Sequence, residues 1–207
     1  MLKRLLTLLL WLLPALLFAG RPVDGYFITA PSALLPQLDS NGRKDLLDFY
    51  DAGQEKHLTN ALGGDLFIER IDERQITLRL SSTSTLQIAL LPVADTIGVI
   101  AVIHTVSLPA SDSRIAFYDT QWRPLEGISR FIPPTVEAFF DKGTKEERKE
   151  AAATINLLPH TYRITGESLE VTQTLADYLP EEIYRRIAPF LAENPLLYRW
   201  NGKHFLP

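Results

Sequence analysis

The stretch from Leu66 to Asp119 decides the fold, and it reads LFIERIDERQITLRLSSTSTLQIALLPVADTIGVIAVIHTVSLPASDSRIAFYD. Apolar or alternating runs recur along it, separated by turn-forming pieces such as Pro109-Ala110-Ser111-Asp112. Connections of about three to six residues favour antiparallel neighbours, because a parallel crossover needs about a dozen residues or more. The pattern therefore predicts an antiparallel β-meander over residues 65–125, with strands at Leu66–Ile71, Gln75–Leu80, Thr85–Leu91, Ile97–Ser107 and Ser113–Asp119.

Residues 20–64, before the meander, are predicted to contain an extended lead-in and a helical segment. Pro22, Pro31 and Pro36 disfavour regular structure, so we expect Gly20–Pro36 to be extended. Asp39-Ser40-Asn41 can then cap a helix that continues through Arg43–Tyr50. Gly63-Gly64 would end this helical region.

Residues 126–207 are predicted to form a second, smaller α+β region that follows a hairpin, helix, hairpin order. The charged run Asp141–Glu150 is typical of a solvated helix face or a linker. Asn201-Gly202 is a strong hairpin signal, because both residues tolerate positive φ. The other elements expected here are a short helix at Thr135–Phe140, a hairpin of Tyr162–Thr165 and Ser168–Thr172, a helix entered at Pro180, and a last hairpin of Leu196–Trp200 and Lys203–Leu206.

Two aromatic segments suggest that the second region is a weak repeat of the first. Phe117–Leu125 and Leu197–Phe205 each pair a tyrosine with a nearby tryptophan at the end of a predicted sheet segment. The alternative is that aromatic residues are simply favoured in strands.

The first 19 residues have the layout of a secretory signal peptide. A cationic start with Lys3 and Arg4 precedes an apolar run from Leu5 to Phe18, and Ala19 offers a small residue for cleavage. A membrane anchor is the alternative, but a run of about 14 residues is shorter than the ~20 that a spanning helix needs. We therefore expect an exported protein, periplasmic or secreted, with no transmembrane anchor after cleavage.

Composition excludes several classes of function. The 207 residues include no cysteine, so disulfides, thiolate metal sites, a cysteine nucleophile and a lipid-modified N-terminal cysteine are all excluded, and we do not expect a lipoprotein. Removing the first 19 residues leaves 188 residues with 19 basic and 25 acidic side chains, a formal charge of −6. Such a chain repels phosphate backbones, so nucleic acid is not an expected partner.

Catalytic and metal-binding motifs are not found in the sequence. His57, His104, His160 and His204 are too far apart in sequence for a local zinc motif, and His104 is expected on a core or sheet face. Gly127-Ile128-Ser129-Arg130-Phe131 begins like a serine nucleophile elbow but has no final glycine. We expect no cofactor, no metal and no catalytic residue that the sequence can name, although a pair of carboxylates brought together only by the fold remains an alternative.

Four aromatic residues are the candidate ligand-binding residues. Tyr118, Trp122, Tyr198 and Trp200 could form a stacking platform for a sugar or a peptide. Core packing is the competing interpretation, because large aromatic residues dominate small cores.

Several motifs resemble an exported family of unknown function from Bacteroidales. They are Pro31–Leu38, Arg43–Tyr50, Thr59–Gly64, Leu90-Leu91-Pro92, and Asp112–Tyr118 running to Trp122. The resemblance covers most of the chain after the signal peptide and implies a protein of the Gram-negative envelope. It implies no activity, so no catalytic residue follows from it.

The sequence thus favours a soluble, exported α+β protein that acts as a non-enzymatic binding or accessory module. Its expected partner is an envelope protein or a glycan. The alternative is an envelope hydrolase acting on glycan or peptide, with carboxylates assembled by the fold.

Overall fold

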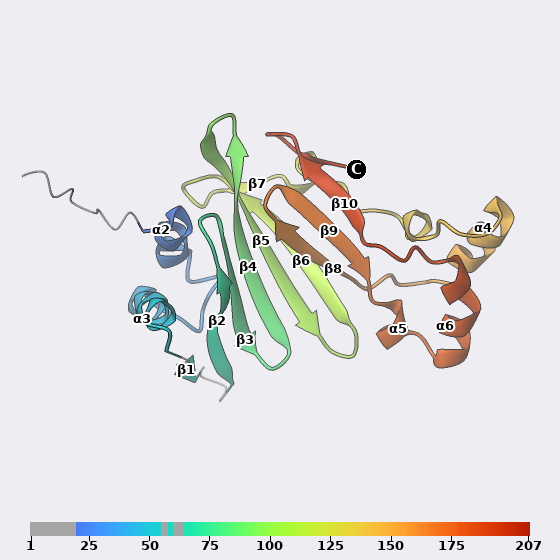
Figure 1. Ribbon diagram of the computed structural model, residues 1–207, viewed down its shortest axis with the longest axis horizontal. Helices are drawn as coiled ribbons and strands as arrows, with labels where there is room; N and C mark the ends of the chain where they lie inside the picture. Colours follow the sequence, from blue (N-terminus) through green and yellow to red (C-terminus); the bar gives the residue numbers. More distant parts are fainter. Residues whose placement is uncertain (1–19, 55–57, 60–63) are drawn as a thin grey trace, which may run out of the picture.

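A seven-stranded antiparallel sheet forms the centre of the protein (Figure 1). The computed structural model describes residues 20–54, 58–59 and 64–207, and the fold is α+β with helices before and after this sheet. The strands follow one another in sequence order, so the predicted meander is confirmed. They are β1 Leu58–Thr59, β2 Asp65–Ile71, β3 Gln75–Ser81, β4 Ser84–Val93, β5 Thr96–Ser107, β6 Ser111–Tyr118 and β7 Pro124–Leu125.

Two helices, α2 (Pro22–Thr29) and α3 (Ser40–Asp51), pack on one face of the central sheet. Asp39 caps α3 as predicted, since its carboxylate accepts a hydrogen bond of 2.8 Å from the backbone N–H of Gly42. The extended lead-in expected for Gly20–Pro36 is wrong in part, because α2 occupies its first half. Pro22 stands at the first helical position, where its missing N–H costs no hydrogen bond. The Gly63 signal lies outside the described residues.

A buried arginine joins the two N-terminal helices. Arg43 of α3 is 3% exposed, and its guanidinium donates to carbonyls at the end of α2, those of Ile28 (3.1 Å) and Ala30. Burial lowers the pKa of Arg43. The carbonyls at the end of a helix have no partner within it, so this side chain supplies one and fixes how α2 and α3 pack.

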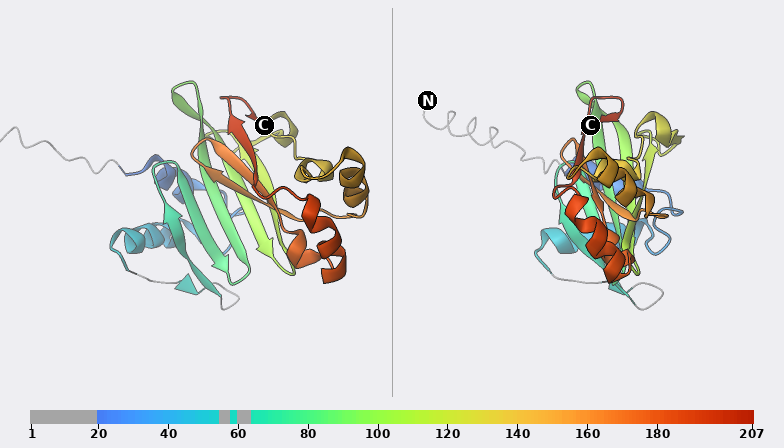
Figure 2. Two further views of the ribbon diagram at one scale, coloured as in Figure 1. Left: turned by 45° about the vertical axis from the view of Figure 1, so that its right-hand side comes forward. Right: turned by 90° about the vertical axis from the view of Figure 1, so that its right-hand side faces the viewer.

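The other face of the central sheet carries a second antiparallel sheet of four strands. Its order is β11-β10-β9-β8, and the side view in Figure 2 shows it packed beside the first sheet. Because successive residues of a strand point to opposite faces, β5 contributes to two hydrophobic cores: Ile100 and Val102 face α2 and α3, and Val99, Ala101 and Ile103 face the second sheet. The strands are β8 His160–Thr165, β9 Ser168–Gln173, β10 Leu196–Trp200 and β11 Phe205–Leu206.

Side chains of the central sheet hold the edge of β8 at both of its ends. The amide of Gln87 in β4 donates to the carbonyl of Ile164 (2.7 Å) and accepts from its N–H (2.9 Å). At the other end, the carboxylate of Asp112 in β6 accepts from the backbone N–H of His160 at 3.2 Å. An edge strand exposes unpaired backbone groups, and these two contacts satisfy part of that edge while they fix β8 across β4 to β6.

Short helices complete the second region. The predicted helix at Thr135–Phe140 is a 3-10 turn at Val136–Phe139, and the charged run after it includes most of α4 (Lys145–Ala153). Thr144 and Glu147 cap α4 reciprocally. Beyond β9 lie α5 (Leu175–Tyr178) and α6 (Glu181–Ile187), the latter entered at Pro180 as predicted. Among the described helices, none is long and apolar enough to cross a membrane.

The last hairpin differs from its prediction in the turn. Trp200 pairs with Phe205, so four residues connect the strands rather than the pair Asn201-Gly202 alone. The side-chain carbonyl of Asn201 accepts from the backbone N–H groups of Lys203 (3.0 Å) and His204 (2.9 Å). These bonds stabilise the four-residue turn, and Gly202 still supplies the positive φ of 89°.

Candidate functional site

The first pair of candidate aromatic residues lies on the face of the central sheet that α2 and α3 cover. The rings of Tyr118 and Trp122 are 5.6 Å apart between centroids, and both residues are partly buried. Trp122 sits at φ 61° in a turn that the Asp119 carboxylate organises. That carboxylate accepts mainly from the backbone N–H of Arg123 and also from its guanidinium (2.6 Å), and these bonds hold the pKa of Asp119 below its ordinary value.

The second pair lies in the other hydrophobic core. Tyr198 packs edge-on against Phe131 at 5.1 Å, and the indole N–H of Trp200 donates to the carbonyl of Pro92 at 2.6 Å. Tyr198 is 8% exposed and Trp200 6% exposed. The structure therefore places the four aromatic residues in two cores on opposite faces of one sheet, and it does not bring them together into one platform.

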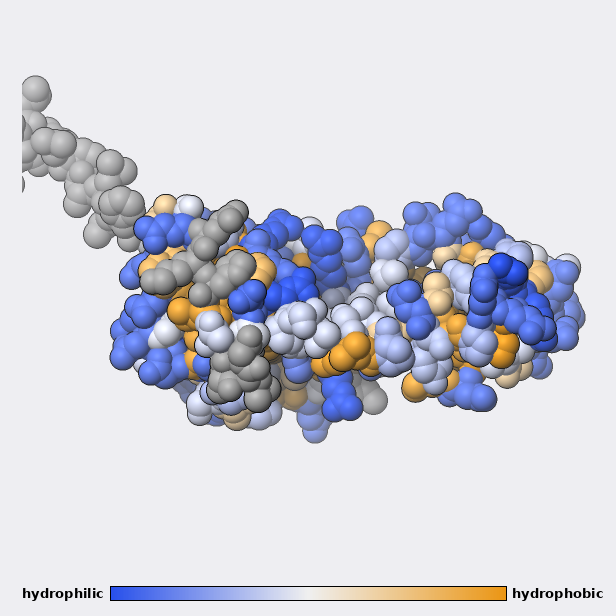
Figure 3. Space-filling model, turned by 90° about the horizontal axis from the view of Figure 1, so that it is seen from below, coloured by the Kyte–Doolittle hydropathy of each residue, from blue (hydrophilic) through white to orange (hydrophobic). Residues whose placement is uncertain are grey.

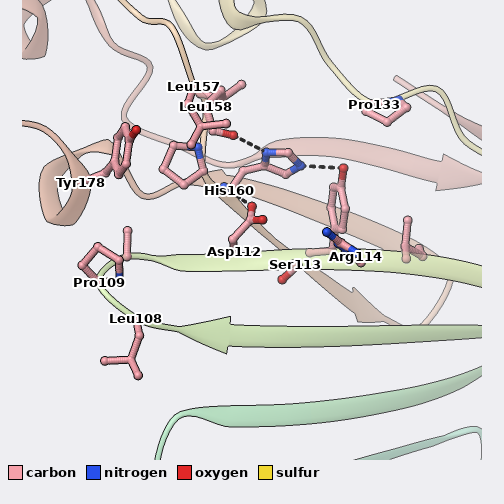
Figure 4. Close-up of a pocket in the computed structure, with 14 residues that line it drawn as sticks. Leu108, Pro109, Asp112, Ser113, Arg114, Pro133, Leu157, Leu158, His160 and Tyr178 are labelled. Carbon is pink, nitrogen blue, oxygen red and sulfur yellow. Dashed lines mark hydrogen bonds between the residues drawn. The ribbon is translucent and has the colours of Figure 1, made fainter. Parts of the chain in front are cut away.

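A hollow of about 570 Å³ opens at the other end of the second region, beside β6. Figure 4 shows its walls: the β5–β6 turn on one side, the segment before β8 and Tyr178 of α5 on another, and Pro133 opposite. We call it the β6 hollow, and its main lining residues are Leu108, Pro109, Ser113, Leu157, His160 and Tyr178.

The rim of the β6 hollow is apolar and faces water. Leu108 is 69% exposed and Leu157 is 57% exposed, with Tyr178 also exposed beside them. Figure 3 views the molecule from the end that carries the β5–β6 turn, and hydrophobic patches there interrupt a mostly hydrophilic surface. Single exposed apolar residues are ordinary, but several around one concave surface mark a binding site.

Two of the polar side chains that line the β6 hollow, His160 and Tyr162, are bonded to each other, and Arg114 also lines it. The Nδ1 atom of His160 lies 2.9 Å from the carbonyl of Leu158, and its Nε2 atom lies 2.6 Å from the hydroxyl of Tyr162 (Figure 4). A carbonyl only accepts, so Nδ1 carries the proton and Nε2 accepts from the tyrosine. Burial raises the pKa of Tyr162 to about 12, with the nearby Asp112 charge adding to the effect.

Among the described lining residues, these contacts do not bring Ser113 and His160 together as a serine–histidine pair. The hydroxyl of Ser113 pairs with that of Thr105 at 2.7 Å, while Nε2 of His160 is taken by Tyr162, so serine and histidine do not act on each other. Of the described residues that line the hollow, Asp112 is the single acid. Among the residues that the structure describes, no group of three His, Asp or Glu could hold a metal ion.

A second hollow of about 800 Å³ lies where the hairpin turns of both sheets meet. It is lined by Trp200 and by three exposed acids, Glu73, Asp95 and Glu167. Glu167 forms an ion pair with Arg74 at 3.4 Å. Sequence reasoning missed both hollows, because their walls come from turns and loops that carry no motif. The signal available was the apolar pair Leu157-Leu158 before Pro159, which fits no predicted element.

Comparison with known proteins identifies the family. The sequence matches DUF3256, described as "Protein of unknown function", over residues 17–205. The chain belongs to the DUF3256 family. Its fold is also similar to the structure of a domain of an uncharacterized protein from Porphyromonas gingivalis W83, with a TM-score of 0.74 and 27% identity over 89% of this chain and 96% of that one. No curated protein matches.

The match confirms that the motifs in the sequence resemble a family of unknown function. This DUF3256 chain is of a family of unknown function and is related to a protein from a Bacteroidales organism. The family description names no activity, so the chemistry of the site has to be argued from the site itself.

Proposed function

We propose that this DUF3256 protein is an exported, non-enzymatic binding module of the bacterial envelope, and that the β6 hollow is its ligand site. The observation that carries the proposal is the combination of an open apolar rim with a histidine, His160, whose two ring nitrogens are already bonded to Leu158 and Tyr162. An enzyme needs a free base or nucleophile within reach of its substrate. The bonded interior of the β6 hollow is suited to holding a ligand rather than to changing it.

An apolar polypeptide segment fits the β6 hollow better than a glycan. The rim offers Leu108, Pro109 and Leu157, and burial of apolar side chains against them is favourable by about 25 cal/mol per Å². Sugar binding relies on exposed aromatic faces and free polar groups. The described aromatic pairs lie in the cores, which leaves Tyr178 as the aromatic ring exposed at the hollow.

The hydrolase alternative is best placed in the second hollow. Three acids, Glu73, Asp95 and Glu167, line one concave surface there. All three stand in exposed turns, where water solvates them. Release of reducing ends or amines from purified envelope glycan or peptide, abolished by Asp95→Asn, would favour the hydrolase over the binding module.

The test uses one exposed leucine inside the hollow and one outside it. Leu157→Asp places a charge on the rim, and Leu197→Asp places the same charge on an exposed leucine (56%) that does not line the β6 hollow. Tagged mature protein and both variants are purified from the native envelope, and co-purified proteins are quantified by mass spectrometry. We expect partners that are retained by the wild type and Leu197→Asp but lost with Leu157→Asp. Equal recovery with both variants would rule out the β6 hollow as the site.

A further inference from the structure

The outer edge of β6 borders the β6 hollow and carries backbone groups that point away from β5. The direction follows from the neighbouring strands. The backbone N–H of Ser107 donates to the carbonyl of Thr83, on the β4 side of β5. Backbone groups alternate in direction along an antiparallel strand, so those of Thr105 and Ile103 also point towards β4 and do not bond to β6. The residues of β6 opposite Ser107, Thr105 and Ile103 are Ser111, Ser113 and Ile115. The N–H and C=O groups of these three residues therefore point outward.

Both ends of this edge already have partners. Phe117, next in the same alternation, pairs with Leu125 of β7. At the other end, the hydroxyl of Thr174 donates to the carbonyl of Ser111 at 2.6 Å. Between them, none of the residues that the structure describes forms a hydrogen bond with the outward N–H or C=O of Ser113 or Ile115. Both residues line the β6 hollow.

Among the described residues, no strand of the chain pairs with β6 at these groups, although β8 lies close to β6. Strand β7 ends at Leu125, and Gly127–Ser129 then forms a 3-10 helix that lies near β6 and does not extend the sheet. A strand that continued the line of β7 would face Ile115 and then Ser113. Unpaired donors and acceptors at the edge of a sheet are complementary to an extended polypeptide, which supplies the same groups in the same spacing.

The shape of the site argues against a second copy of this chain as the occupant. The edge of β6 is recessed, since Ser113 is 5% exposed, and Leu157, Tyr178 and Pro133 line the hollow on the side of β6 that Figure 4 shows. Two identical recessed edges cannot approach each other, because their walls would collide first. A thin extended segment can enter.

We propose that the ligand of the β6 hollow is an extended polypeptide segment that adds to β6 as a strand, in line with β7. Its backbone pairs with Ser113 and Ile115, and alternate side chains, apolar ones, contact Leu157 and Tyr178. This inference rests on the proposed function and adds the way in which the ligand binds. Between the partnered residues Ser111 and Phe117, residues 112–116 leave about 13 Å of edge at about 3.3 Å per residue, which is enough for a short strand.

The probe is a phage-displayed library of random peptides of about ten residues, selected on the mature protein. Enriched peptides are synthesised, and their affinity is compared for wild type, Leu157→Asp and Leu197→Asp. Each peptide is also made with single N-methylated backbone positions, because N-methylation removes one donor and keeps the side chain. We expect N-methylation at alternate positions to weaken binding by about tenfold each, which corresponds to one lost hydrogen bond.

Two further measurements place the strand on β6. On addition of peptide, the amides of Ser113 and Ile115 should exchange with solvent at least tenfold more slowly, by about the factor expected for a newly formed hydrogen bond. Ser113→Pro removes an outward N–H without removing a bond to β5, so it should weaken peptide binding. If that variant does not fold, the N-methylated peptides still decide the question.

The outcomes separate the mode of binding from the site. If the selected peptides lose affinity for Leu157→Asp but tolerate N-methylation everywhere, strand addition is wrong and the β6 hollow stands as the site. If they bind Leu157→Asp and wild type equally, or if selection enriches no peptide, the proposed function fails together with the inference.

Discussion

Tyr162 places a hydroxyl group between the β6 hollow and the main hydrophobic core. The residue is 7% exposed, its ring packs edge-on against Phe131 at 5.5 Å, and its hydroxyl contacts His160. A buried tyrosinate is poorly solvated by water, so the charged form of Tyr162 is disfavoured relative to the neutral form. This explains why its pKa lies near 12 rather than 10.0.

We therefore predict that stability falls between pH 10 and 12 because of Tyr162. A folded pKa above the unfolded one means that the contribution is complete below pH 10 and is lost as the pH rises towards 12. A difference of about two pKa units corresponds to roughly 2 to 3 kcal/mol. Urea unfolding at pH 9 and pH 11.5 measures how far the free energy of unfolding decreases between these pH values, and Tyr162→Phe should make this decrease smaller. Tyr178→Phe, at an exposed tyrosine, is the control and should retain it.

At the scale of elements, β5 depends on a glycine at the β4–β5 bulge. The pairing of β4 with β5 shifts register between Leu91 and Pro92, and Gly98 lies at that shift. A Cβ atom added to Gly98 would lie 2.3 Å from Cγ2 and 2.6 Å from Cβ of Val93. A side chain here would have to displace the neighbouring strand end.

Gly98→Ala is predicted to lower the free energy of unfolding by about 1 to 3 kcal/mol, the usual cost of overpacking. Val93→Gly removes both atoms that would collide, so Gly98→Ala should cost less in that background. Gly25→Ala in α2 is the control, because nothing lies within 4 Å of its added Cβ. The free energies of unfolding of the wild type, Gly98→Ala, Val93→Gly and the double variant are measured by chemical denaturation, and they give the coupling energy between positions 93 and 98; Gly25→Ala is measured in the same way. An unchanged cost in the Val93→Gly background would contradict the steric explanation.

The strands were predictable because their signal is local. Alternation along Gln75–Leu80 and the apolar run Ile97–Ile103 each specify a strand whatever surrounds them, and the short turns between them specify antiparallel order. The helix α2 was not predicted, because Pro22 was interpreted as a breaker although it stands where a helix begins. Proline position, rather than proline content, decides such segments.

The candidate site could not be predicted, because its parts come together only in the fold. Leu108 and Leu157 lie 49 positions apart and belong to different regions, yet they share one rim. The aromatic residues gave the stronger sequence signal, but Trp200 and Tyr198 fill a core and Trp122 covers another. Burial on the two faces of a sheet depends on which layers pack there, and a single sequence does not specify the layers.

At the scale of the whole molecule, export is the property that the proposed function needs first. Replacing Leu8 to Leu10 by charged residues interrupts the apolar run that a signal peptide requires. We expect this variant to accumulate in the cytoplasm as an unprocessed precursor, detected by the mass of the protein in fractionated cells. Leu197→Asp, a similar change on the surface of the second sheet, should mature normally. Normal processing of the Leu8–Leu10 variant would argue against export by this signal.

The central sheet belongs to two hydrophobic cores at once, and this affects how the protein can be divided. If the chain were cut after Leu125, the first fragment would keep its helices but expose Leu91, Ala101, Ile103 and Phe117 to water on the side that β8 to β11 now cover. The second fragment would lose the face of the central sheet against which β8 to β11 pack. Residues 126–207 are therefore not a portable module, and heating the intact protein should melt both sheets in one calorimetric transition.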